Sequence, residues 1–189
     1  MAIESPKYKL IKHEGKFELR RYEGFITANV EVSANGYSNA GNNAFGTLAD
    51  YIFGNNTTSG NIEMTAPVSA QKISSSEKIA MTVPVDATKL ANDKYLVSFT
   101  MPSSYSMRSL PKPNNSSVQI KETKATTFAA IKFSGYSGDD KVQKLANMLE
   151  EWCKTKGIKT TGHPILSRFD SPFKPGFLRH NEILFRVKD

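Results

Sequence analysis

The chain has 189 residues, 39% hydrophobic and 23% charged, and this balance excludes an intrinsically disordered chain. Its single cysteine excludes an intrachain disulfide and a cysteine-based zinc site, and a chain of this length folds without either. The net charge is +7, but the basic residues are scattered, so we expect a solvated basic surface and no nucleic-acid partner. No apolar run is long enough to span a membrane and residues 1–10 lack a signal-peptide core, so we expect a cytoplasmic location.

Two strands and a helix are predicted in the first part of the chain. Residues 17–21 alternate apolar and charged side chains, and residues 25–32 are rich in β-branched side chains. Both ranges are therefore predicted strands, joined by a hairpin turn at 22–24. Residues 37–53 have the apolar spacing of a helix, although Gly41 within it costs about 1 kcal/mol relative to alanine.

A short internal repeat follows the predicted helix. The sequence Ile-x-Met-Thr-x-Pro-Val occurs at 62–68 and again at 79–85, and both copies are predicted strands with a proline near the end. Residues 95–101 are a further predicted strand. Residues 102–117 carry three prolines among serines and asparagines, which predicts a long loop.

The second part of the chain repeats this order of elements. The predicted helix at 139–156 begins with two aspartates, ends in lysines before Gly157 and has one apolar stripe. The predicted strands around it are 118–121, 127–133, 164–169 and 182–187. We therefore expect an α+β fold in a single domain over 1–189, duplicated in halves at about 8–101 and 118–187. Each half contributes one main helix to two antiparallel sheets packed together.

No catalytic or metal-binding motif stands out in the sequence. The three histidines, His13, His163 and His180, are not spaced as a ligand set, although a single histidine suffices for a haem iron. No P-loop, dinucleotide fingerprint or serine nucleophile elbow is present. Cys153 is predicted to be buried on the second helix. We therefore expect a binding protein, with enzymatic activity left open.

The two predicted helices differ in their surfaces. The second has a charged outer face, whereas the first is apolar over more than half its circumference and almost uncharged. Such a helix is either covered by the long loop at 102–117 or forms a cleft for a flat apolar ligand. Met64 and Met81 would add adaptable side chains if their strands adjoin this helix.

Several segments together resemble the SOUL haem-binding family over nearly the whole chain. They are Phe-Glu-Leu-Arg-Arg-Tyr at 17–22, the helix residues 44–55, the Met-Thr-x-Pro-Val motifs at 64–68 and 81–85, and the closing Arg-Phe-Asp … Phe-Leu-Arg-His-Asn-Glu at 168–182. The resemblance implies a distorted barrel of two antiparallel sheets with a helix on each half. It also implies that haem or a related tetrapyrrole binds in an apolar cleft near the first helix.

The resemblance further implies which residues hold the ligand. Lys174 stands where the family places a cation suited to a haem propionate. The cleft residues on or near the first helix are Asn42, Phe45, Ala49, Ile52 and, if its strand lies nearby, Met64. Within this helix we assign Phe45 to the ligand and Leu48 to the core.

The position of the iron ligand differs from that in some relatives. Arg21 stands where some members carry a candidate axial histidine, and arginine does not ligate iron because it stays protonated. His180 is a weak substitute candidate, so the metal ligand stays open. We expect a soluble carrier or buffer that binds haem or a porphyrin reversibly. The alternatives are an enzyme that releases iron from haem and a ligand-sensing or interaction module.

Overall fold

The computed structural model describes residues 3–58, 76–91, 93–171 and 173–188. Helix α1 spans Tyr37–Ile52, helix α2 spans Asp139–Thr155, and a short 3₁₀ helix, η1, spans Gly176–Leu178. Neither α-helix is long and apolar enough to cross a membrane. The strands are β1 (Tyr8–Glu14), β2 (Phe17–Tyr22), β3 (Phe25–Ser33), β4 (Asn56–Thr57), β5 (Val85–Ala91), β6 (Lys94–Thr100), β7 (Lys112–Pro113), β8 (Gln119–Thr123), β9 (Thr126–Ser134), β10 (Thr160–Arg168) and β11 (His180–Val187).

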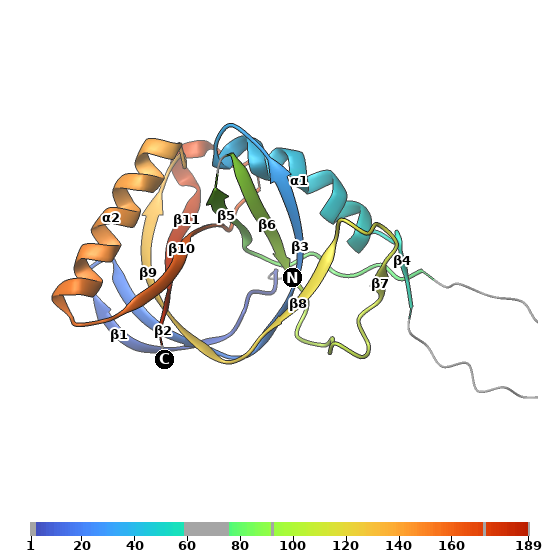
Figure 1. The fold of residues 1–189 in the computed structure, drawn as a ribbon, viewed down its shortest axis with the longest axis horizontal. Helices are drawn as coiled ribbons and strands as arrows, with labels where there is room; N and C mark the ends of the chain where they lie inside the picture. The colour runs from blue at the N-terminus through green and yellow to red at the C-terminus, as the bar shows by residue number, and fades with distance from the viewer. Residues whose placement is uncertain (1–2, 59–75, 92, 172, 189) are drawn as a thin grey trace, which may run out of the picture.

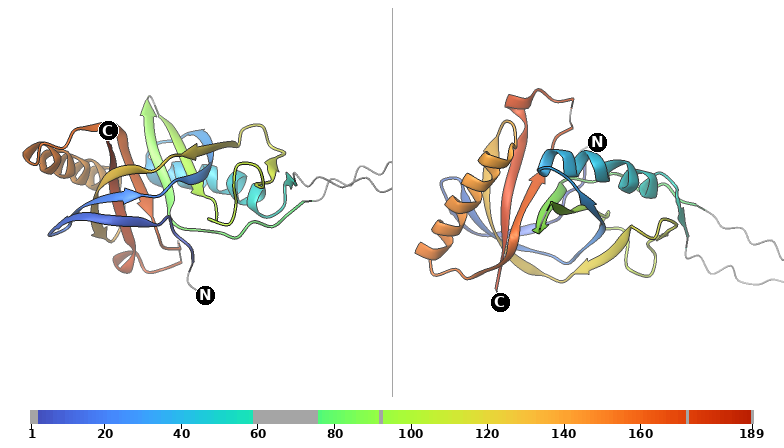
Figure 2. Two further views of the ribbon diagram at one scale, coloured as in Figure 1. Left: turned by 90° about the horizontal axis from the view of Figure 1, so that it is seen from below. Right: turned by 45° about the horizontal axis from the view of Figure 1, so that its top comes forward.

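Nine strands form one antiparallel sheet in the order β1-β2-β9-β11-β10-β5-β6-β3-β8. The sheet is strongly curved, and both helices lie on its outer, convex side (Figure 1). Strands β4 and β7 form a separate two-stranded sheet near the C-terminal end of α1 (Figures 1 and 2). The α+β fold with antiparallel sheets and two main helices is therefore confirmed.

The strand order is symmetric about the contact between β5 and β10. On one side the order is β5-β6-β3-β8, and on the other it is β10-β11-β9-β2. Helix α1 follows β3 in the chain, as α2 follows β9. One strand of each half pairs with a strand of the other half, because β2 pairs with β9 and β8 pairs with β3. This symmetry supports the predicted duplication in halves at about 8–101 and 118–187, which stays a prediction.

The predicted hairpin between 17–21 and 25–32 is wrong, although both strands exist. Strand β2 pairs with β1 and β9, whereas β3 pairs with β6 and β8. The residues at 22–24 carry the chain from one half of the sheet to the other. A short connection between two predicted strands does not fix their pairing, because every strand offers the same backbone groups to any neighbour.

The predicted strand at 79–85 is also wrong for most of its length. Strand β5 begins only at Val85, directly after Pro84, whose ring nitrogen cannot donate to a ladder. The first copy of the repeat, at 62–68, lies outside the described residues. The predicted loop at 102–117 is confirmed apart from the two-residue strand β7, and β1 is not among the predicted strands.

The main hydrophobic core lies between the convex face of the sheet and the two helices. Helix α1 packs on β3, β5 and β6 and buries Leu48, whereas α2 packs on β9, β10 and β11 and buries Leu149. Cys153 is buried, as predicted. The sheet residues in this core include Ala28, Val97, Ile131, Leu166 and Ile183. Because side chains alternate along a strand, their sequence neighbours face the concave side of the sheet.

A close contact with β10 explains the glycine inside α1. A Cβ atom at Gly41 would collide with the Nη2 atom of Arg168, so a side chain at this position would force the guanidinium to move. The same Nη2 atom donates a hydrogen bond of 2.8 Å to the carbonyl oxygen of Tyr37. This contact fixes the end of β10 against the beginning of α1, and it outweighs the low helix propensity of glycine.

Candidate functional site

The residues predicted to line a cleft on the first helix are divided between surface and core. Asn42 and Phe45 are exposed, whereas Ala49 is 8% and Ile52 only 1% exposed. Met64 lies outside the described residues. A ligand on the outer surface of α1 would therefore contact Asn42 and Phe45 first, and it would reach Ile52 only if the neighbouring chain moved.

Phe45 is a large apolar side chain with 43% of its surface exposed. Its ring contacts the buried ring of Phe99 edge-on, at 5.6 Å between centroids and 62° between planes. The contact with Phe99 anchors the exposed ring to the sheet. Leu48, three residues further along α1, is completely buried, which agrees with its assignment to the core.

Lys174 lies in the loop between β10 and β11. Its Nζ atom is 2.7 Å from Oδ1 of Asp170, and its side chain is 39% exposed. The other carboxylate oxygen of Asp170 accepts a hydrogen bond of 2.5 Å from the backbone N–H of His180. Lys174 is therefore a partly exposed cation that is held by Asp170.

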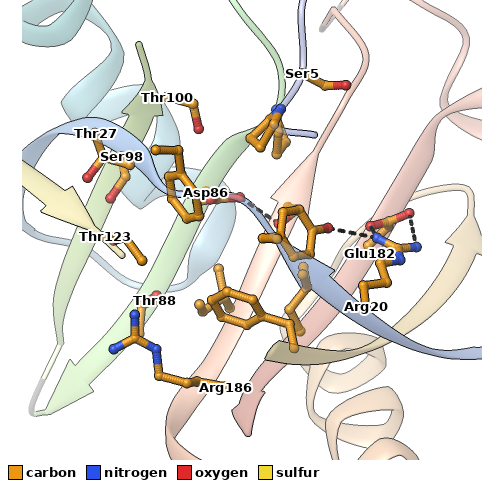
Figure 3. A pocket seen from close by; sticks show the side chains of 18 of the residues that line it. Ser5, Arg20, Thr27, Asp86, Thr88, Ser98, Thr100, Thr123, Glu182 and Arg186 are labelled. Atoms are coloured by element: carbon orange, nitrogen blue, oxygen red, sulfur yellow. Dashed lines mark hydrogen bonds and ion pairs between the residues drawn. The ribbon is translucent and has the colours of Figure 1, made fainter. Parts of the chain in front are cut away.

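The described residues also line a partly open cavity of about 580 Å³ on the concave face of the sheet, opposite the helices (Figure 3). Among the residues predicted from the sequence, His163 and His180 line this cavity. Asn42, Phe45, Ala49, Ile52 and Lys174 do not. The structure thus separates the predicted helix site from the two histidines, which lie on the other side of the sheet.

A buried ion-pair network centred on Arg20 forms one wall of the cavity. Arg20 is 1% exposed, and its Nη1 and Nη2 atoms donate to the two carboxylate oxygens of Glu182 at 2.6 and 2.9 Å. Its Nε atom donates to Oε2 of Glu18 at 2.6 Å, and the Nζ atom of Lys132 donates to Oε1 of the same carboxylate at 2.7 Å. Two cations, Arg20 and Lys132, thus balance the two carboxylates Glu18 and Glu182. Nη1 also donates to the hydroxyl of Tyr22 at 3.0 Å. The arginine is therefore fully engaged with protein groups.

These contacts determine the pKa values in the network. Burial alone would raise the pKa of Glu182, but hydrogen bonds from His180 and Arg20 outweigh it and lower this pKa to about 2. Burial likewise opposes the charge of Arg20, yet the hydrogen bonds to Glu182 raise its pKa above the usual value. Burial raises the pKa of the Tyr22 hydroxyl. Glu182 and Arg20 are therefore both charged at neutral pH.

Asp86 is a second carboxyl group on the cavity wall, and it has a different environment. Its Oδ1 atom accepts a hydrogen bond of 2.5 Å from the hydroxyl of Ser167. Burial raises the pKa of Asp86 to about 7, against the lowering effect of the Ser167 hydrogen bond, and the charge of Glu182 adds to the rise. No cation in the described part of the chain forms an ion pair with Asp86.

Strand register places these polar groups in one row across the concave face. Asp86 pairs with Ser98 on one neighbouring strand and with Ser167 on the other. Ser167 pairs in turn with Glu182, and Glu182 with Lys132 on β9. This row was not predicted from the sequence, because its members lie far apart in the chain. The available signal was the alternation of apolar and polar residues in Val-Asp-Ala-Thr at the start of β5 and in Val-Ser-Phe-Thr at the end of β6.

The histidines near this row do not form part of a metal cluster. The Nε2 atom of His180 lies 3.0 Å from Oε1 of Glu182. Within the described ranges, no group of three or more His, Cys, Asp or Glu side chains is arranged to hold a metal ion. Arg21, at the position of a candidate axial histidine in some relatives, is exposed on β2 and donates to the Thr127 hydroxyl at 3.2 Å.

Solved structures with a similar fold have low sequence identity to this chain. The crystal structure of the EcmrR C-terminal domain matches with a TM-score of 0.64 at 12% identity, over 96% of this chain and 98% of that one. The crystal structure of a hydrolase from Listeria innocua matches with a TM-score of 0.56 at 11% identity, over 94% of each chain. At these identities the likeness shows the fold alone.

Sequence comparisons give a more specific result. The "Heme-binding protein 1" of Xenopus tropicalis is 27% identical over 188 residues, covering 97% of this chain and 92% of that protein. The family model described as "SOUL heme-binding protein" matches residues 3–186. With this match over nearly its whole length, the chain belongs to the SOUL haem-binding protein family.

Proposed function

We propose that this protein binds haem or a related tetrapyrrole reversibly at the outer surface of α1, and that it carries or buffers the ligand without transforming it. The support is its family membership together with the name of its Xenopus relative. The observation that carries the location is the exposed ring of Phe45, held edge-on against Phe99. An anchored aromatic ring is suited to contact the flat face of a tetrapyrrole.

The neighbouring residues fit such a ligand. Asn42 lies one helical turn before Phe45 and is exposed. Two further exposed apolar side chains belong to segments at the end of α1. Phe53 directly follows the helix, and Met81 lies two residues after Ile79, whose backbone N–H donates to the carbonyl oxygen of Ile52. Lys174, in the loop between β10 and β11, offers a cation for a propionate. Ala49 and Ile52 would support this surface from beneath.

An absorbance titration with haem tests the location. Phe45→Ala should weaken binding by about three- to tenfold, which is the free energy of one aromatic contact. Leu10→Ala is the matched control, because Leu10 is 48% exposed on the edge strand β1, away from α1. Unchanged binding by Phe45→Ala, with Leu10→Ala also unchanged, would exclude the surface of α1.

The same preparation separates a carrier from an enzyme that removes iron. A carrier leaves the iron in the ring, so incubation with haem should release no free iron and give no porphyrin fluorescence. Release of both would support the enzymatic alternative. A sensing or interaction module would instead acquire a protein partner only when haem is bound, which a pull-down with and without haem would detect.

A further inference from the structure

The concave cavity has no part in the proposed haem surface, yet it has the size of a ligand site. Its volume of about 580 Å³ lies within the range of pockets that bind small molecules. It lies on the face of the sheet opposite α1, so it is a separate place on the molecule. Its chemistry therefore has to be explained on its own.

One half of the cavity wall is apolar and aromatic. Tyr22, Phe128 and Leu184 form a small buried cluster against which Phe25 packs, separate from the main core. The rings of Tyr22 and Phe128 meet edge-on at 5.4 Å between centroids. The guanidinium of Arg186 lies over the Phe128 ring at 5.9 Å, so this aromatic wall already holds a cation at its rim.

The other half of the wall carries hydroxyl groups. Ser98 and Thr100 on β6 and Thr27 on β3 line the cavity from neighbouring strands (Figure 3). Ser98 donates to Asn29 at 2.6 Å and Thr27 to a backbone carbonyl at 3.4 Å. The Oγ1 atom of Thr100 has no hydrogen-bond partner among the residues that the structure describes, although Thr100 is only 5% exposed. A buried hydroxyl without a partner is costly, and a polar ligand group would satisfy it.

Asp86 also lines the cavity, and among the described residues no cation forms an ion pair with it. Glu182 and Glu18 are neutralised by Arg20 and Lys132, whereas Asp86 has one hydrogen bond from Ser167. Figure 3 shows Asp86 between the hydroxyl side of the cavity, with Ser98 and Thr100, and the Arg20–Glu182 pair. A carboxyl group in this position has unused acceptor capacity for a donor inside the cavity.

We infer that the cavity is a second ligand site, for a small amphipathic amine. Its ammonium group binds to Asp86 and its apolar body lies against Tyr22 and Phe128. A hydrogen bond between a charged donor and a carboxylate is stronger than a neutral one, and aromatic faces attract cations. The exposed rim cations Lys121 and Arg186 oppose a cationic ligand, but exposed charges act weakly through water and salt.

A series of three probes with the same body and different charge tests this inference. Calorimetry would compare 4-phenylbutylamine, 4-phenylbutanol and 4-phenylbutyrate on the full chain at neutral pH. We expect the amine to bind at least about tenfold more tightly than the alcohol, because a hydrogen bond to a charged group is stronger than a neutral one. Equal binding of amine and alcohol, preference for the butyrate, or no binding at all would overturn the inference.

Asp86→Asn identifies the group responsible. Asparagine keeps the shape and an acceptor for Ser167, so the variant should fold and lose the preference for the amine. Asp50→Asn is the matched control on α1, because Asp50 is exposed and distant from the cavity, and it should keep the preference. If Asp86→Asn does not fold, backbone NMR of the unmodified protein with and without the amine would locate the binding site. The amine must then shift amides around Asp86 and Thr100 in β5 and β6, and shifts confined elsewhere would overturn the site.

Competition with haem keeps this inference apart from the proposed function. Protein saturated with haem should bind 4-phenylbutylamine with unchanged affinity. Displacement of one by the other would place haem in the cavity and overturn the separation of the two sites. A protein that binds no haem at all would contradict the proposed function while leaving the amine experiment intact.

Discussion

Arg20 and Glu182 are 162 positions apart in the chain, yet they form a two-pronged ion pair at 2.6 and 2.9 Å with both side chains at most 3% exposed. They come from β2 and β11, which both pair with β9. The pair thus bridges a strand of the first half to a strand of the second. Because it is buried, removing one partner leaves an uncompensated charge in the protein interior.

Glu182→Gln should therefore lower the free energy of unfolding by about 3–5 kcal/mol, measured by urea denaturation. Replacing both partners by apolar residues, as in Arg20→Met with Glu182→Leu, should restore part of this loss, because no buried charge is then unpaired. The control is Lys154→Ala, which removes the exposed pair with Glu150 and should cost at most about 0.5 kcal/mol. A Glu182→Gln variant no less stable than this control would contradict the role assigned to the pair.

Asp86 makes stability fall as the pH rises. Its pKa is about 7 in the folded protein and near 3.8 when unfolded, so the folded state holds a proton that the unfolded state has lost between these values. The contribution of the protonated Asp86 to the free energy of unfolding is complete below pH 3.8, and it is lost as the pH rises through 7. The groups that interact with Asp86 in the folded protein are the hydroxyl of Ser167, the carboxylate of Glu182 and the hydroxyl of Tyr22.

Asp86→Asn should remove this dependence. Between pH 5 and pH 8 the unmodified protein should lose up to about 2 kcal/mol relative to the variant, measured as the difference in their unfolding free energies. Other titrating groups cancel in this comparison. A difference that stays constant between these pH values, or an unmodified protein that gains stability relative to the variant as the pH rises, would contradict the raised pKa of Asp86.

Leu48 and Phe45 should respond in opposite ways to truncation. Leu48 is completely buried in the core, so Leu48→Ala should lower the free energy of unfolding by about 2–5 kcal/mol and spare haem affinity in the folded fraction. Phe45→Ala should cost less stability and weaken haem binding. Thermal melts would measure the stability of both variants, and haem titrations would measure their haem affinity. A large loss of haem affinity in Leu48→Ala, with no loss in Phe45→Ala, would show that Leu48 and not Phe45 contacts the ligand.

Neither cavity histidine should act as a haem ligand. His163 and His180 line the concave cavity, on the opposite face of the sheet from α1, and arginine occupies position 21. His163→Ala and His180→Ala should therefore leave the Soret spectrum of the haem complex nearly unchanged. Loss of a low-spin spectrum in either variant would identify that histidine as the ligand and move haem into the cavity.

Lys174 should contribute a modest, salt-dependent part of haem affinity. Its side chain is partly exposed and shared with Asp170, so Lys174→Ala should weaken binding only a few-fold at low salt. The difference should shrink at high salt, where screening already weakens the interaction. Lys154→Ala, on the far helix α2, serves as the control. A hundredfold loss independent of salt would indicate a structural role for Lys174.

The sequence by itself determined the features that depend on local periodicity. Strands β2 and β3, helix α2 with its aspartates and following Gly157, and the burial of Leu48 follow from spacing and end signals within a few residues. The family motifs in the sequence also predicted membership of the SOUL family, which the family model confirmed. The sequence distinguished the exposed Phe45 from the buried Leu48. It did not predict the burial of Ile52, because that burial depends on a distant part of the chain that covers the helix.

Only the tertiary structure decided the strand partners and hence the cavity. Strands β2 and β3 are neighbours in the chain but belong to different halves of the sheet, because backbone hydrogen bonds carry no record of which strand should pair with which. Asp86 received Ser98 and Ser167 as neighbours only through the register of β5 with β6 and β10. The same register placed no described cation in an ion pair with Asp86. The pairing of β2 and β11 with the same strand, β9, brought Arg20 to Glu182, and the curved sheet turned the polar faces of separate strands towards one cavity.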